Sequence, residues 1–113
     1  MNQLNKLAKQ AYNSACKRGL FDKELSTNDL LMAIVEEIAE VRKSKFCCGD
    51  GNYILETIED DVFMSKFELF FKDSTQAEFA DILIATLAIM AHLKIDVDLF
   101  VELGLRYNSL RGK

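Results

Sequence analysis

The chain of 113 residues carries 14 basic and 18 acidic side chains, a formal net charge of −4, and half of its residues are hydrophobic. The acidic balance argues against a dedicated nucleic-acid binder, including a helical regulator acting on nucleic acid, because such proteins carry a basic patch or stripe. The length predicts a single domain over residues 1–113, and the lack of proline with only five glycines favours helices.

The three cysteines are Cys16, Cys47 and Cys48, an odd number with an adjacent pair, which is not the pattern of a secreted disulfide framework. The polar N-terminus has no signal-type apolar segment. The longest nearly uncharged run, residues 82–93, is shorter than the roughly 20 apolar residues that span a bilayer. We therefore expect a cytoplasmic protein without a membrane partner.

The first half of the chain contains two predicted helices. Apolar side chains recur at helical spacing over residues 4–18, and the glycine that follows is expected to end this helix. A second helix is predicted from a polar N-cap cluster to about Lys43. Ser26 and Asp29 have the spacing of a capping box, with Asn28 as an alternative cap.

The second half begins with a predicted turn over residues 47–52. Residues 53–71 fit a helix, although the phenylalanines at its end could begin a short extended piece. A further helix is predicted from Ser74 or Thr75 to about Leu93. After the connector 94–96, either Asp96 or Asp98 is expected to cap a last helix that reaches about Leu110. Because short connections favour antiparallel neighbours, the sequence predicts an all-α fold, a compact antiparallel bundle of four to five helices.

Two carboxylates interrupt the most apolar of these helices. Glu78 and Asp81 are the only charged residues from Ala77 to Ala91, and their i,i+3 spacing places them on one helix face. A helix that is apolar on nearly every side is expected to be central and buried. Ionised carboxylates there are costly unless paired or metal-bound. The alternative is an exposed first turn, where the helix dipole favours acidic residues.

The second helix supplies another acidic pair. Glu37 and Glu40 are also three residues apart, beside the apolar stripe, while Glu36 faces more nearly outward. Taken alone, this pair could be a solvated acidic face. Two pairs on two helices favour a site for a hard cation with oxygen ligands, Mg²⁺ or alternatively Mn²⁺.

The last helix carries groups that suit phosphate. Arg106, Asn108 and Arg111 cluster near the C-terminus, and arginine makes bidentate contacts to phosphate. The same residues could instead solubilise a helix end and complement its dipole. His92 fits a structural role, and zinc is disfavoured because the adjacent cysteines lack the usual ligand spacing.

The ordered motifs resemble the MazG-like family of all-α nucleoside triphosphate pyrophosphohydrolases. The family patterns EExxE and ExxD correspond to residues 36–40 and 78–81. Residues 71–82 resemble the family's K-D-T-x-x-D-E-x-A-D-I region, and residues 105–111 resemble its terminal Y-N-x-x-R. There are two departures: the gap of 37 residues between the acidic motifs is long for the family, and Gly104 stands where the family often has lysine.

The resemblance implies Mg²⁺-dependent cleavage of a (deoxy)nucleoside triphosphate to the monophosphate and pyrophosphate by activated water. Its implied ligands are the four carboxylates of the two pairs, with a lesser role for Glu36 in orienting water. It also implies that oligomers, a homodimer or a dimer-based tetramer, complete the fold. The alternative is a non-enzymatic helical interaction or regulatory module that keeps the fold, which the missing lysine at Gly104 encourages.

Overall fold

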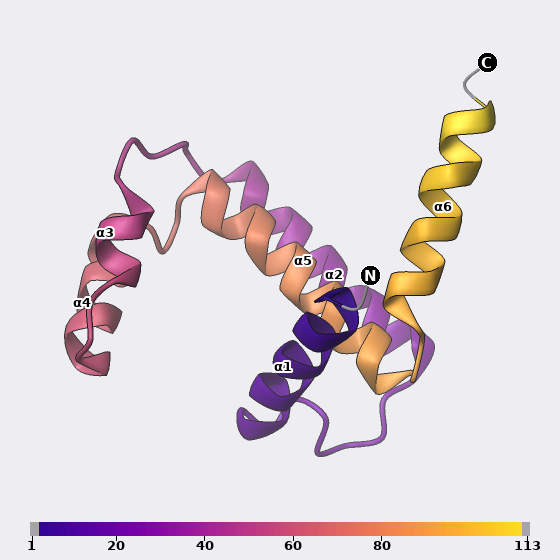
Figure 1. Ribbon diagram of the computed structural model, residues 1–113. Helices are drawn as coiled ribbons and strands as arrows, with labels where there is room; N and C mark the ends of the chain where they lie inside the picture. The colour runs from indigo at the N-terminus through magenta and orange to yellow at the C-terminus, as the bar shows by residue number, and fades with distance from the viewer. Residues whose placement is uncertain (1–2, 112–113) are drawn as a thin grey trace. The chain divides into compact units, whose positions relative to one another are not determined.

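The computed structural model describes residues 3–111, which form α-helices and no strand. The six helices are α1 (Gln3–Lys17), α2 (Thr27–Arg42), α3 (Gly51–Leu55), α4 (Asp60–Phe70), α5 (Thr75–His92) and α6 (Val97–Arg111) (Figure 1). The all-α prediction is therefore confirmed. The chain divides into two units, one formed up to Leu31 and again from Leu83 onward, the other by Met32–Ile82.

The local signals that begin and end helices act as the sequence predicts. Gly19, at φ +79°, follows α1, and its N–H and that of Leu20 bond back to the Cys16 and Ala15 carbonyls. This is a Schellman motif. The α2 capping box also forms, because the Asp29 N–H donates to Ser26 Oγ and the Ser26 N–H donates to Asp29 Oδ2. Ser26, and not Asn28, therefore caps α2.

The prediction of one continuous helix over residues 53–71 is wrong. Two helices, α3 and α4, stand in its place, so the described residues form six helices where four to five were predicted. The Asp50 side chain accepts the Asn52 N–H and starts α3 inside the predicted turn. The chain leaves the helix after Leu55 and restarts at Asp60, with Glu59 as an extended N-cap residue. Asp60 and Asp61 lie in the first turn of α4, where the helix dipole favours acidic residues.

The first unit has a core of small residues. Three alanines of α1 pack with Leu87, Ala88 and Val97, and Val97 is 1% exposed. Because alanine side chains are short, α1 can approach its neighbours closely, and α1 and α6 are in contact. A ring stack borders this core. His92 lies 4.4 Å from Phe21 between ring centroids, and Tyr12 lies 5.2 Å from Phe21.

The second unit ties the end of α2 to the start of α5. Lys45 and Ser74 form an isolated parallel β-bridge, and the Thr75 N–H donates to the Lys45 carbonyl at 2.9 Å. The Gln76 side chain accepts the Cys47 N–H at 3.1 Å and donates to its carbonyl at 2.8 Å. These bonds fix the first turn of α5 beside the chain that leaves α2.

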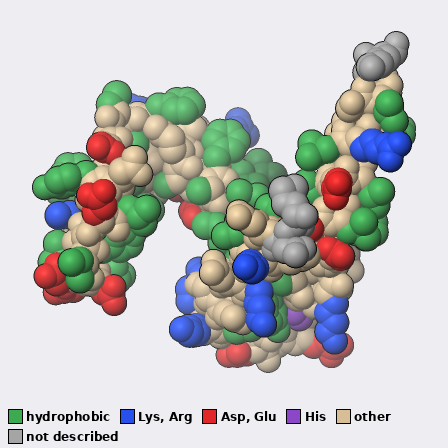
Figure 2. Space-filling model, viewed as in Figure 1, with side chains coloured by type: hydrophobic (Ala, Val, Ile, Leu, Met, Phe, Trp, Pro, Cys, Tyr) green, Lys and Arg blue, Asp and Glu red, His purple; other side chains and the backbone are tan. Residues whose placement is uncertain are grey.

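Much apolar surface stays uncovered within residues 3–111. Hydrophobic side chains reach the surface over α3, α4 and α6 (Figure 2). On α5, Leu87 and Ala88 are buried but Phe79, Leu83 and Ile84 are exposed. The prediction that α5 is buried on nearly every side is therefore wrong for this chain taken alone. Among the described residues, no helix has both the length and the apolar character needed to cross a bilayer.

Candidate metal centre

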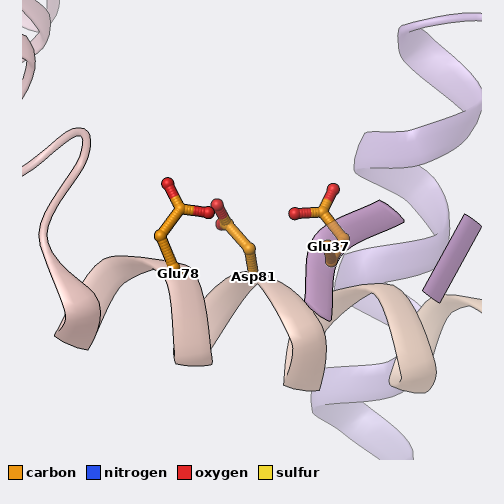
Figure 3. A group of neighbouring side chains, drawn as sticks. All are labelled: Glu37, Glu78 and Asp81. Atoms are coloured by element: carbon orange, nitrogen blue, oxygen red, sulfur yellow. The ribbon is translucent and has the colours of Figure 1, made fainter. Parts of the chain in front are cut away.

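Three of the predicted carboxylates meet in the second unit. Glu78 and Asp81 project from the same side of α5, and Glu37 reaches toward them from α2 (Figure 3). Each offers one oxygen, and the three oxygens lie within 4.8 Å of one another. The i,i+3 spacing on α5 accounts for the first two positions. The third depends on α2 lying alongside α5 within this unit.

Glu78 is the buried member of the group. Its residue is 7% exposed although it belongs to the first turn of α5, so the alternative of an exposed first turn is wrong for Glu78. Glu37 is half-buried and Asp81 is exposed. Burial raises the pKa of the Glu78 carboxyl, and the charges of Asp81, Glu40, Glu37 and Asp73 raise it further.

This environment suits a cation. A carboxylate surrounded by four other carboxylates is disfavoured as an anion, and a divalent ion removes that penalty by supplying the opposite charge. Two oxygens on opposite sides of one Mg²⁺ are about 4 Å apart, because Mg–O distances are about 2.1 Å. The three oxygens of Glu37, Glu78 and Asp81 lie within 4.8 Å of one another, an upper limit slightly above this span. The donor set, all oxygen, fits Mg²⁺ or Mn²⁺.

The other acidic residues of α2 are less central. Glu40 is exposed and is not part of the three-oxygen group, but its charge contributes to the raised pKa of Glu78. Its role as a direct ligand stays a prediction. Glu36 is exposed, in agreement with the expectation that it faces outward.

Asp73 is the residue near the site that sequence reasoning missed. Its charge also raises the pKa of Glu78, although it lies outside α5 and one residue before the bridge at Ser74. Helical spacing cannot place a residue that precedes the helix. The signal available was its position directly before the predicted start of this helix.

The predicted phosphate-binding residues lie elsewhere along the chain. Arg106, Asn108 and Arg111 are exposed on α6, which belongs to the first unit, whereas the carboxylates belong to the second. The Arg111 guanidinium carbon lies 5.5 Å from the ring centroid of Tyr107. The part of these three residues in the site stays a prediction.

His92 and the cysteines take other positions. The stack of His92 on Phe21 supports a structural role for the histidine. Cys47 is anchored through its backbone to Gln76, and all three cysteines are free thiols.

Comparison of the chain with known proteins adds no assignment to this geometry. No family model, no curated protein and no solved structure matches it.

Proposed function

We propose that the chain is a Mg²⁺-dependent nucleoside triphosphate pyrophosphohydrolase of the MazG-like type. The observation that carries this proposal is the convergence of Glu37, Glu78 and Asp81 within 4.8 Å, with Glu78 buried. The ordered motifs of the sequence connect this site to nucleotide chemistry. Glu40 is the fourth proposed ligand, and Mn²⁺ is a possible substitute for Mg²⁺.

The proposed reaction is a hydrolysis at the α phosphorus. A water oxygen forms a bond to that phosphorus, the bond to the bridging α–β oxygen breaks, and pyrophosphate leaves while water gives up a proton. When bound, Mg²⁺ supplies charge neutralisation at the phosphate oxygens and lowers the pKa of coordinated water. The protein's part is to hold the ligands: Asp81 and Glu78 are fixed by the rigid helix α5, and Glu37 by α2. Glu36 is the proposed residue for orienting water.

The remaining parts of the proposal concern α6 and assembly. Arg106, Asn108 and Arg111 contact the phosphates, as the terminal Y-N-x-x-R resemblance implies. A homodimer or a dimer-based tetramer, in the cytoplasm, is the proposed state. This state is supported by exposed apolar side chains on α2, such as Met32 and Val35, since exposed apolar surface marks interaction sites.

A substrate panel tests the activity directly. Purified protein with Mg²⁺ is incubated with ribo-, deoxyribo- and modified nucleoside triphosphates, and the products are separated by ion exchange. Monophosphate and pyrophosphate in equal amounts are expected. Release of orthophosphate alone, or no turnover across the panel, contradicts the proposal.

A second function is favoured by two observations. Gly104 replaces a lysine that the family often has, and exposed apolar side chains occur on several helices, as in a module that binds other proteins. Titration calorimetry with Mg²⁺ and a nonhydrolysable nucleotide separates the two functions. An interaction module binds neither, whereas the hydrolase binds the metal and then the nucleotide.

A further inference from the structure

The second unit contains a cavity that the proposed function does not yet use. Its volume is about 440 Å³, and it lies among α3, α4 and the start of α5. Pockets of roughly 300–1,000 Å³ are typical of small-molecule sites. Its walls are mainly apolar side chains and glycines, and none of the residues that line it carries a charge. A neutral ring therefore suits this cavity, and a phosphate does not.

Aromatic side chains form one wall. Phe63, Phe67 and Phe71 follow one another at four-residue spacing, and successive ring centroids are 6.2 and 6.5 Å apart. All three line the cavity. Aromatic faces hold nucleobases by stacking, which tolerates any base because every base has a π-face.

Another part of the lining comes from the start of the helix that carries the carboxylates. Ser74 and Ala77 line the cavity, and with Glu78 and Asp81 they occupy positions i, i+3, i+4 and i+7. Residues at this spacing share one helix face. Because the rise is 1.5 Å per residue, Ser74 and Glu78 are about 6 Å apart along the axis. Side chains of α5 also tilt toward its N-terminus, so both carboxylates lean toward the cavity end of the helix.

Contacts within the chain hold parts of the cavity lining in place. The Gln76 amide is fixed by its two bonds to the Cys47 backbone, at 2.8 and 3.1 Å. Gly49 packs directly against Phe71, since a Cβ at Gly49 would lie 2.9 Å from Phe71 Cζ. The cavity is therefore a preformed feature of this unit.

We infer that this cavity receives the base of a nucleoside triphosphate whose phosphates are bound through Mg²⁺ at Glu37, Glu78 and Asp81; the inference rests on the proposed function. It gives the long segment between the acidic motifs a role, because that segment supplies the aromatic wall. Tyr12 and Phe21 are two further aromatic residues that could stack on a base, but their rings contact each other and His92 instead.

Two variants alter the cavity in opposite directions. Phe67→Ala removes the middle ring, and Gly51→Leu adds a side chain at a lining position where a Cβ meets nothing within 4 Å. Each is expected to raise the KM for nucleoside triphosphates at least about fivefold, Phe67→Ala because it removes a stacking surface and Gly51→Leu because its side chain occupies space that the base needs. Mg²⁺ affinity by calorimetry and inhibition by Mg²⁺–tripolyphosphate, which has no base, stay unchanged. Met64→Ala, on the same helix but outside the cavity lining, is the control.

Nuclear magnetic resonance gives a readout apart from activity. A nonhydrolysable nucleoside triphosphate with Mg²⁺ is expected to shift the ring signals of Phe63, Phe67 and Phe71, whereas Mg²⁺–tripolyphosphate leaves them in place. Shifts confined to Phe21 and His92, or an unchanged KM in both variants of an active enzyme, overturn the inference alone. A wild-type protein that neither binds Mg²⁺ nor turns over nucleotides overturns the proposed function and this inference together.

Discussion

Asn5 and Asp98 cap each other's helices. Asp98 Oδ2 accepts the Asn5 N–H at 3.1 Å in the first turn of α1, and Asn5 Oδ1 accepts the N–H of Val97, the first residue of α6, at 2.8 Å. Asp98 Oδ1 also accepts the Leu4 N–H. Each helix N-terminus therefore has at least one of its unpaired N–H groups satisfied by the other helix, which joins secondary structure to tertiary packing in the first unit.

Asp98→Ala is expected to destabilise the protein by about 1–2 kcal/mol, because it removes the acceptor for two N–H groups at the start of α1. Thermal or urea unfolding followed by circular dichroism measures the change. Glu102→Ala, an exposed acidic position on the same helix, is the control and should change stability by less than about 0.5 kcal/mol. Equal losses in the two variants would contradict the capping role.

Lys94 is expected to be replaceable by glycine with a gain in stability. It follows α5 at φ +60°, and the Lys94 and Ile95 N–H groups bond back to the Ala91 and Met90 carbonyls in a Schellman motif. A left-handed conformation costs an L-residue about 1 kcal/mol. Lys94→Gly should therefore raise the free energy of unfolding by a similar amount, while Lys94→Ala keeps the strain and brings no gain. A loss of stability in the glycine variant would show that the lysine side chain contributes more than the strain costs.

The pH dependence of stability without metal is expected to carry the signature of Glu78. Because burial and four acidic neighbours raise its pKa in the folded chain, the folded state keeps a proton that the unfolded chain has released. The resulting stability is fully present below the ordinary glutamate pKa and is lost as pH rises through the raised folded pKa.

Glu78→Gln removes this titration. Without metal, the variant should be more stable than the wild type at neutral pH and equal to it in acid. Saturating Mg²⁺ should stabilise the wild type at neutral pH and the variant less, as ligand binding to the folded state requires. Melting temperatures from pH 3 to 8, with and without Mg²⁺, provide the comparison. A variant less stable than the wild type at every pH would contradict the electrostatic account.

Removing either outer carboxylate should abolish turnover and leave the fold intact. Glu37→Ala and Asp81→Ala each take one oxygen from the three-carboxylate group, and the expected fall in kcat/KM is at least about a hundredfold. Mg²⁺ affinity by calorimetry should fall in parallel. Glu68→Ala, at an exposed position on α4, is the control. Full activity in both site variants would mean that the site is wrongly assigned.

Gly104→Lys tests the departure from the family pattern. A Cβ at Gly104 meets nothing within 4 Å, so a longer side chain fits, and removing a glycine from the interior of α6 should add about 0.5–1 kcal/mol of stability. If the lysine contacts phosphate, the KM for nucleoside triphosphates also falls. Gly104→Ala gives the stability gain without the charge, so a KM change shared by both variants would exclude a phosphate contact.

Local signals in the sequence predicted the helix boundaries best. The spacing of Ser26 and Asp29 and the glycine after α1 act over three to five residues, and the structure forms both features. The sequence analysis does not predict the break between α3 and α4, because Asp50 lies in the predicted turn and Asp60 inside the predicted helix, although both stand where helices begin.

Tertiary relationships were harder to predict. Glu78 was identified because a charge in an apolar helix needs an explanation, and Glu37 because of its angle on α2. Neither argument could show that the charge of Asp73 raises the pKa of Glu78, or that Asp98 caps α1. Such contacts depend on how the helices pack against one another, and the spacing of residues within one helix carries no information about that packing.

The bridge between Lys45 and Ser74 has a consequence for how this chain can change. Because Lys45 and Ser74 are paired, the segment between them is a loop whose two ends are held together, one after α2 and the other before α5. The entropy of closing such a loop grows only slowly with its length. Insertions and deletions in this loop can therefore be accommodated while the bridge keeps Lys45 and Ser74 paired. The length of the segment that forms the cavity can thus change while the carboxylates of α2 and α5 keep their separation.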